Sequence, residues 1–263
     1  LSHFDLGALL GKAGMGVVHR ATRRRDGAAL ALKLVPSLSE ADLHARLQAA
    51  REITVMRALA HPRIVRVEDH GAYRRRPSAS ILEQGLFYTM EICEGGSLFD
   101  RLKAHGPLPF AQLRDTLRDV LDALAFAHAH PGRFVHRDIK PGNILLDAPG
   151  GFRAKLADFG ISKSAVDAGA SSLTDVPAPK GTWSFMPPEQ QTRARWATPA
   201  SDVFSVAATF LRATTGRGHE QARAAHPHLP PAVAAVLDKA LRFQPEDRFA
   251  DAAALRAALA PHL

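Results

Sequence analysis

Hydrophobic and polar positions divide the chain into a first part that favours strands and a second part that favours helices. Over residues 4–35, short apolar runs alternate with turn residues, which predicts three strands joined by turns. Residues 40–59 carry apolar side chains at intervals of three and four, the spacing of a helix with one buried face. The Arg-rich residues 71–86 favour an extended turn, and residues 86–90 are the next predicted strand.

The second part of the chain has the longer periodic segments. They predict helices over residues 112–130, 201–213, 231–242 and 250–259. Before the second of these helices, residues 134–146 place three polar side chains, Asp138, Lys140 and Asn143, between two short apolar runs. A proline-glycine pair in this stretch excludes a continuous helix. We therefore expect a loop, anchored at both ends, that holds three polar groups in fixed positions.

Composition narrows the class of protein. The 263 residues, 46% of them hydrophobic and 23% charged, suit a packed globule of one large domain or two lobes. No run of about eighteen apolar residues predicts a membrane span, and no signal peptide opens the chain. Because the chain begins with Leu1, we expect a segment of a longer protein. We expect it to be cytoplasmic, either alone or as the cytoplasmic part of a membrane-anchored chain.

Cysteine and histidine content argues against a metal centre built from these residues. The single cysteine, Cys93, excludes an intrachain disulfide and a cysteine-based zinc site. The pairs His128/His130 and His226/His228 lack thiolate or acidic partners at ligand spacing. We interpret these four residues as solvated histidines.

The net charge of +8 raises the question of nucleic-acid binding. The charge is dispersed except for arginine runs at 23–25 and 74–76, and no aromatic residues alternate with these runs. We interpret the runs as exposed basic turns and expect no specific nucleic-acid partner, although acidic or phosphorylated partners are favoured. The alternative, a nucleic-acid binder, would show a steeply salt-dependent affinity for DNA.

Three further features of the first part of the chain have both a structural and a functional interpretation. Residues 11–16 contain three glycines, which let the backbone approach a bound group and expose N–H donors to it. On its own this pattern is more often a hairpin without function. Lys33 interrupts an apolar run, where it is either a buried, paired lysine or a solvent-facing lysine of an edge strand. Glu52 lies beside the apolar stripe of the predicted helix 40–59 and, on its own, is an ordinary surface acid.

In their order along the chain, these features resemble the parts of a protein kinase domain. The string from His136-Arg137-Asp138 to Asn143 resembles the catalytic loop, and Asp158-Phe159-Gly160 follows it. Lys140, two residues after Asp138, resembles the Ser/Thr-specific enzymes. The chain is identified as a member of the eukaryotic-like (Hanks-type) serine/threonine protein kinases, bacterial branch.

The resemblance implies an α+β, bilobal protein-kinase fold. The N-lobe would cover residues 1–90, with a small antiparallel β-sheet and one helix. Residues 91–96 would form the hinge, and residues 97–263 a larger, mainly helical C-lobe. Asp202 would bind the backbone of the catalytic loop, and Arg248 would pair with Glu189.

The resemblance also implies the chemistry, which is transfer of the γ-phosphate of ATP to Ser/Thr hydroxyls of proteins, including the kinase itself, with Mg²⁺ or Mn²⁺. The implied catalytic residues are Asp138, Lys140, Asn143, Lys33 and Glu52. The implied ATP-binding residues are Gly11, Gly14, Gly16, Val18, Ala31, Lys33, Met90, Glu91, Cys93, Ser97 and Leu145. The implied metal ligands are Asn143 and Asp158. The implied regulatory residues are Arg137, which would bind an activation-loop phosphate, and Thr174 and Thr182.

Two departures from the family pattern support a second hypothesis. Ala13 stands where the phosphate loop usually has its middle glycine, and residues 218–229 are shorter than the family's docking region. Both slightly favour a pseudokinase scaffold that holds nucleotide without transferring phosphate. The presence of every polar catalytic residue favours the enzyme.

Overall fold

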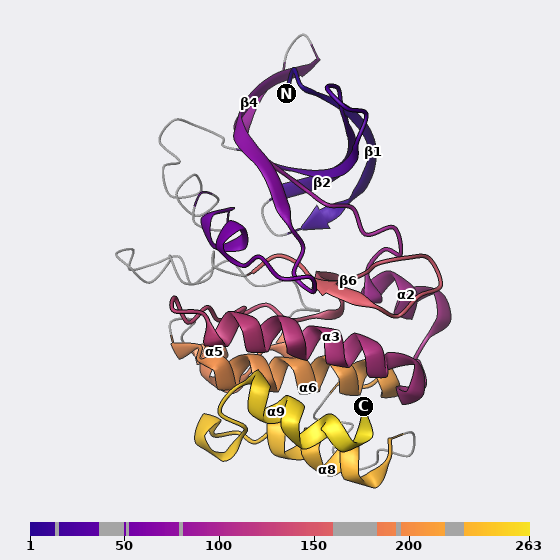
Figure 1. Cartoon of the computed structure of the whole chain (residues 1–263), viewed down its shortest axis with the longest axis vertical. Helices are drawn as coiled ribbons and strands as arrows, with labels where there is room; N and C mark the ends of the chain where they lie inside the picture. Colours follow the sequence, from indigo (N-terminus) through magenta and orange to yellow (C-terminus); the bar gives the residue numbers. More distant parts are fainter. Residues whose placement is uncertain are drawn as a thin grey trace. The chain divides into compact units, whose positions relative to one another are not determined.

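The computed structural model describes residues 1–13, 16–36, 50, 53–78, 81–159, 183–192, 196–218 and 229–263. The chain divides into two compact units (Figure 1). Unit 1 comprises residues 1–60 and 65–92, and unit 2 comprises residues 61–64 and 93–263. A sheet dominates unit 1 and helices dominate unit 2, which confirms the predicted α+β class. Within the described ranges, no helix has both the length and the apolarity to cross a membrane.

Unit 1 is built on one curled antiparallel sheet of order β1-β2-β3-β5-β4 (Figure 1). Its strands are β1 (Phe4–Ala13), β2 (Gly16–Arg23), β3 (Ala29–Pro36), β4 (Val67–Ser78) and β5 (Ile81–Met90). Alternate side chains point to one face of each strand. One face buries a cluster that includes Phe4, Leu32, Leu34, Tyr73 and Phe87. This burial supplies the main stabilisation of the sheet.

The predicted extended turn at 71–86 is wrong, because these residues belong to the long hairpin β4–β5. Tyr73 points into the core and pairs with Gly85, while Arg75 forms an ion pair of 2.6 Å with Glu83 on the neighbouring strand. The arginines are thus strand residues, with cross-strand partners for Arg74 and Arg75. The run of charged residues at 74–76 interrupts the alternation of apolar and polar side chains by which a strand is predicted from sequence.

The helix predicted at 40–59 is described at residue 50 and over residues 53–58, and both stretches are helical. Ile53, Met56 and Leu59 are buried, at 4%, 2% and 2% exposure. They follow the three-residue spacing of the predicted apolar stripe, so this part of the prediction is confirmed.

Unit 2 is built around α6 (Pro199–Thr215), which is buried along almost its whole length. It contacts α3 (Phe110–Ala129), α8 (Pro231–Ala240) and α9 (Ala252–Leu259), as Figure 1 shows. All four predicted helices of this part are confirmed within a few residues. Within the described ranges of unit 2, the other α-helices are α2 (Leu98–His105) and the short α5 (Pro188–Thr192).

A two-stranded sheet, β6 (Ile144–Leu146) paired with β7 (Ala154–Leu156), completes unit 2. It is held to the residues that precede α2, since Gly95 N–H donates to the Leu146 carbonyl at 3.0 Å. A Cβ atom at Gly95 would lie 2.5 Å from the Ala148 carbonyl oxygen, so only glycine fits this close approach.

Candidate active site

The predicted loop between α3 and β6 brings its three polar side chains together. Lys140 Nζ lies 2.8 Å from Asp138 Oδ2, and Asn143 Nδ2 donates to the same oxygen at 3.1 Å. Asn143 Nδ2 also donates to the Asp138 carbonyl oxygen at 2.8 Å. An ammonium group and an amide therefore hold one carboxylate in a fixed orientation. A carboxylate that accepts a proton from a substrate hydroxyl must be placed in this way.

A buried carboxylate anchors this loop. Asp202, in the first turn of α6, is fully buried, and it accepts the backbone N–H groups of His136 at 2.7 Å and Arg137 at 2.8 Å. A third hydrogen bond comes from His128 Nε2 at 2.9 Å. A buried carboxylate is costly unless its oxygens are hydrogen-bonded. Asp202 and the loop therefore stabilise each other, and the role that the resemblance implied for Asp202 is confirmed.

His128 corrects the interpretation that it is a solvated histidine, because it is only 8% exposed at the end of α3. Its Nδ1 accepts the N–H of Ala252 at 3.3 Å, so its proton lies on Nε2 and is donated to Asp202. One imidazole therefore links α3, α6 and the start of α9. These elements are distant in the sequence, and residue spacing gave no signal for this burial.

Two non-glycine residues of the site have left-handed backbone conformations. They are Arg137, with φ of 69°, and Asp158, with φ of 54°. Such conformations cost about 1–3 kcal/mol each and persist where the surroundings fix them. At Arg137 the N–H is held by Asp202, and the carbonyl accepts a hydrogen bond of 3.1 Å from Gln190 Nε2. Strained backbone conformations cluster at functional sites, so these two residues support the assignment of this region as the candidate active site.

His136 connects the catalytic loop to the residues before Asp158. It is fully buried, its Nε2 donates to the Ala157 carbonyl at 3.0 Å, and its Nδ1 accepts the N–H of Asp138 at 3.3 Å. Its ring also lies against Phe159, with 4.6 Å between the ring centres. Burial lowers the pKa of His136 below the ordinary histidine value. The neutral ring is required, since a protonated Nδ1 could not accept a hydrogen bond.

We expect acid to destabilise the chain through His136. The unfolded chain takes up a proton at this residue as the pH falls through about 6.5. The folded chain resists protonation, because the folded pKa is lowered. Between pH 7.5 and 5.5, the wild type should therefore lose about 1 kcal/mol more unfolding free energy than His136→Gln. Urea unfolding at both pH values measures this difference.

The control for this experiment is His3→Gln, at an exposed histidine in unit 1. It should lose as much stability on acidification as the wild type. An equal loss in His136→Gln and the wild type would contradict the assigned role of His136.

The donor set of Asn143 and Asp158 fits a hard divalent cation. Both acceptors of Asn143 Nδ2 lie on Asp138, so the amide oxygen of Asn143 is left for a metal. Asp158 is half-buried and adds carboxylate oxygens. In the described part of the chain, no group of three or more His, Cys, Asp or Glu residues could hold a metal. Few protein oxygens, with phosphate and water as further ligands, are typical of Mg²⁺ sites.

In unit 1, the predicted nucleotide-binding residues lie on neighbouring strands. Lys33 is 4% exposed in the central strand β3, and its Nζ lies 5.4 Å from the centre of the Tyr88 ring. The alternative of a solvent-facing edge-strand lysine is therefore wrong. Val18 is paired with Lys33 across β2 and β3, and Ala31 with Met90 across β3 and β5.

Two described glycines of the predicted phosphate loop differ in their surroundings. A side chain at Gly16 would collide with the Leu34 carbonyl of β3, so the sheet itself requires this glycine. Gly11 has open space around it. That space is what a residue near a bound phosphate needs, and Gly11 stays a predicted binding residue.

The predicted ATP-binding residues include two whose polar groups have partners in the structure. The Glu91 N–H donates to the Arg66 carbonyl at 3.1 Å. Ser97 caps α2, because its hydroxyl accepts the N–H of Asp100 at 3.1 Å and donates to the Asp100 carboxylate. Any contact of the Ser97 hydroxyl with ATP would therefore involve Asp100 as well. Cys93 and Leu145 are half-buried in unit 2.

The comparisons with known proteins agree with this geometry. The protein kinase domain family matches residues 4–256 of the chain. The chain belongs to the protein kinase family. Serine/threonine-protein kinase PknB of Mycobacterium leprae is 32% identical over 97% of the chain, and PknD of Mycobacterium tuberculosis is 33% identical over 98%. The chain spans 42% and 39% of the length of these relatives.

A solved structure supports the bilobal kinase fold. The crystal structure of Rad53 residues 1–466 in complex with AMP-PNP matches 96% of this chain and 64% of that chain, with a TM-score of 0.71. At 23% identity this likeness concerns the fold alone. The sheet of unit 1 and the helices of unit 2 are the two lobes of the kinase fold.

Within this kinase domain, the implied pair of Glu189 and Arg248 is confirmed. The guanidinium donates to both carboxylate oxygens, at 2.8 and 2.9 Å, and Ser201 Oγ adds a third hydrogen bond of 2.7 Å. Burial acts to raise the pKa of Glu189, but the hydrogen bonds from Arg248 and Ser201 outweigh it and lower the pKa below its ordinary value. The carboxylate stays charged on the C-lobe helix α5.

Four predicted site residues of the kinase lie outside the described residues. They are Gly14, Glu52, Thr174 and Thr182. Residues 219–228, which form most of the shortened docking region, lie outside them as well. The roles of these residues stay predictions from the resemblance.

Proposed function

We propose that the chain is the catalytic domain of a serine/threonine protein kinase that transfers the γ-phosphate of ATP to protein hydroxyls. The observation that carries this proposal is the Asp138 carboxylate, held by Lys140 and Asn143 on a loop that Asp202 anchors. We also propose that the domain is the cytoplasmic part of a longer chain, since the relatives are more than twice its length.

In the proposed mechanism, Asp138 orients the substrate hydroxyl and accepts its proton. Lys140 balances negative charge on the transferred phosphoryl group. Asn143 and Asp158 supply oxygen ligands to Mg²⁺, or to Mn²⁺, which when bound neutralises charge on the ATP phosphates. Lys33, paired with Glu52, binds the remaining phosphates. The buried setting of Lys33 supports this role, because a buried ammonium requires anionic partners.

The remaining proposed roles concern binding and regulation. The backbone of residues 11–16 covers the phosphates, with Val18, Ala31, Met90, Glu91, Cys93, Ser97 and Leu145 around the nucleoside. Arg137 binds an activation-loop phosphate, for which Thr174 is the proposed autophosphorylation site, and Thr182 contacts the substrate segment. Protein substrates include a second copy of the kinase itself.

Phosphoamino-acid analysis tests the proposed function. After incubation of the chain with Mg²⁺, radioactive ATP and a mixed protein substrate, we expect phosphoserine and phosphothreonine without phosphotyrosine. Lys33→Met should lower incorporation by about 100-fold, because one preorganised phosphate-binding charge is lost. Lys103→Met, at an exposed lysine of α2, is the matched control and should retain activity. Nucleotide binding without transfer would establish the pseudokinase instead.

A further inference from the structure

Gln190 is a buried polar residue to which the proposed mechanism gives no role. It is 5% exposed in the short helix α5, and its Nε2 donates to the Arg137 carbonyl at 3.1 Å. Its amide oxygen is buried and has no donor among the described residues. A buried acceptor without a donor costs about 1–3 kcal/mol. Stability alone therefore does not favour glutamine at this position.

The carbonyl that Gln190 holds belongs to the peptide group between Arg137 and Asp138. A peptide group is planar and turns as one unit, so the partners of its carbonyl and its N–H set its orientation. Gln190 holds the carbonyl, and His136 Nδ1 accepts the N–H of Asp138 at 3.3 Å. The peptide group that precedes Asp138 is therefore bonded to a side chain at both ends.

This peptide group needs to be held because Arg137 has a left-handed backbone, with φ of 69°. Such a conformation costs about 1–3 kcal/mol and persists only where the surroundings fix it. Asp202 accepts the N–H of Arg137, but that bond fixes the peptide group before Arg137. The peptide group after Arg137 depends on Gln190 and His136. If it turned, the direction of the Asp138 side chain would change with it.

Helix α5, which carries Gln190, is itself fixed to the C-lobe. The neighbouring Glu189 accepts hydrogen bonds from Arg248 and Ser201. Ser201 and Asp202 are adjacent in the first turn of α6. The start of α6 therefore holds α5 through Ser201 and the catalytic loop through Asp202. Gln190 adds a direct bond between α5 and the loop.

We propose that Gln190 is a positioning residue for the general base, and that it directs the Asp138 carboxylate through the Arg137 carbonyl. This inference rests on the proposed function, in which Asp138 accepts the proton of the substrate hydroxyl. Lys140 and Asn143 hold the carboxylate oxygen, and Gln190 holds the backbone from which the side chain starts. Misplacing a reacting group by about 1 Å costs up to about 100-fold in rate.

Steady-state kinetics of Gln190→Met test the inference. Methionine keeps most of the volume and removes the N–H donor. We expect kcat to fall about 10- to 100-fold, with KM for ATP within about twofold of the wild type. Gln191→Met is the matched control, because Gln191 is the exposed neighbour on α5 and donates to the Met186 carbonyl at 2.9 Å. It loses the same kind of bond and should keep kcat within about twofold.

A double variant separates positioning from a general loss of structure. Asp138→Asn has no base to misplace, so adding Gln190→Met should change its residual kcat by less than about twofold. A structural defect would lower kcat by the same factor in both backgrounds. Melting temperatures show that each variant is folded. Gln190→Asn is a second, milder variant, which keeps an amide but withdraws it from the Arg137 carbonyl by one methylene, and it should lower kcat as well.

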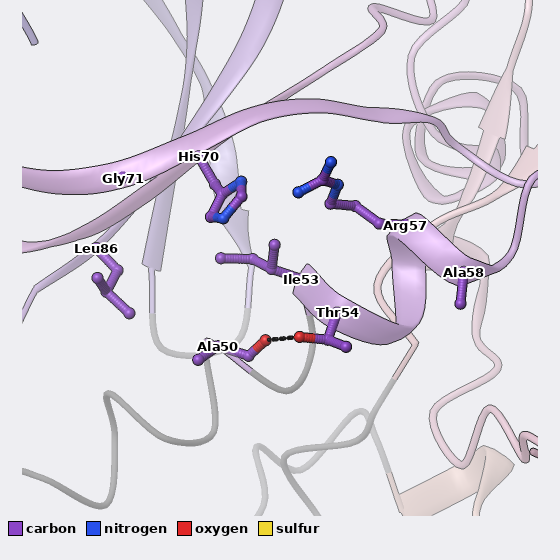
Figure 2. Close-up of a pocket in the computed structure, with 8 residues that line it drawn as sticks. All are labelled: Ala50, Ile53, Thr54, Arg57, Ala58, His70, Gly71 and Leu86. Atoms are coloured by element: carbon purple, nitrogen blue, oxygen red, sulfur yellow. Dashed lines mark hydrogen bonds between the residues drawn. The ribbon is translucent and has the colours of Figure 1, made fainter.

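Hydrogen exchange measures the hold on the loop without phosphoryl transfer. The amide proton of Asp138 should exchange at least about tenfold faster in Gln190→Met than in Gln191→Met, because its peptide group is released. Thr54→Val is a further control in unit 1. It removes the bond of 2.8 Å from Thr54 Oγ1 to the Ala50 carbonyl, the dashed line in Figure 2, and should leave exchange at Asp138 unchanged.

Three results would overturn the inference while the proposed function stands. They are a wild-type kcat in folded Gln190→Met, an equal loss of kcat in the Asp138→Asn background, and unchanged exchange at the Asp138 amide. A wild type that transfers no phosphate would overturn the proposed function and, with it, the part of Gln190 in catalysis. Exchange needs no substrate, so it would still report whether Gln190 holds the loop.

Discussion

Asp138→Asn is expected to lower kcat for phosphoryl transfer by about 10²- to 10⁴-fold, the contribution of a positioned general base. The amide keeps the shape of the carboxylate but cannot accept the hydroxyl proton. It also removes the charge that holds Lys140 Nζ at 2.8 Å. The Asp138 backbone carbonyl still accepts a hydrogen bond from Asn143, so the loop should keep its conformation. Steady-state assays with a protein substrate measure the change.

Separate measurements of kcat, of KM for ATP and of the melting temperature distinguish a loss of catalysis from a loss of folding. We expect KM for ATP and the melting temperature of Asp138→Asn to stay close to those of the wild type. Asp115→Asn is the matched control, because this aspartate is half exposed on α3 and pairs only with its neighbour Arg118 among the described residues. A kcat for Asp138→Asn within twofold of the wild type would remove Asp138 from the mechanism.

The catalytic loop was predictable because its chemistry is contiguous in the sequence. Asp138, Lys140 and Asn143 lie within one short stretch, and the fold needs only a tight turn to bring their side chains together. The helices of unit 2 were predictable for a related reason. Each carries its own apolar stripe, so the periodicity that buries it is local.

The hairpin β4–β5 was not predictable in the same way. Its strand residues Arg74 and Arg75 look like turn residues until their cross-strand partners, Gln84 and Glu83, are known. Pairing between strands supplies the stabilisation that local propensity does not.

His128 shows the same limit within the site. Its burial follows from the meeting of α3, α6 and α9, and each of its ring nitrogens has a partner far away in the sequence. Polar residues that are buried by tertiary contacts carry no periodic signal of their own. The resemblance identified Asp202 but did not identify the imidazole that supports it.

Arg248 is a further buried polar hub, outside the catalytic loop. Its side chain is fully buried, and each of its five N–H donors has an acceptor. The acceptors are Glu189 Oε1 and Oε2 and the carbonyl oxygens of Ala200, Arg242 and Phe243. The guanidinium also lies 4.9 Å from the centre of the Phe204 ring. One side chain therefore joins α5, α6 and the segment after α8.

Arg248→Met is expected to destabilise the chain by about 3–5 kcal/mol, the cost of removing one partner of a buried ion pair. The methionine fills most of the volume, but it removes the donors that Arg248 gives to the Glu189 carboxylate and to three carbonyl oxygens, and it leaves the Ser201 hydroxyl as a donor to that carboxylate. This corresponds to a melting temperature lower by about 10 °C for a chain of this size. Arg248→Lys should be destabilising too, since an ammonium has three donors and lacks the planar fork.

Arg256→Met provides the matched control, because it removes an arginine of α9 that is 51% exposed and bonded to Asp122. Its cost should stay below about 1 kcal/mol, as for most exposed ion pairs.

Adding Glu189→Gln to Arg248→Met should recover part of the loss, since the buried charge is then gone. The recovery should be larger at pH 7 than at pH 4. In the wild type, the lowered pKa keeps Glu189 charged. In Arg248→Met, the unpaired carboxylate takes up a proton in acid, so at pH 4 less buried charge is left for Glu189→Gln to remove. Equal melting temperatures for Arg248→Met and Arg256→Met would mean that this hub does not stabilise the C-lobe.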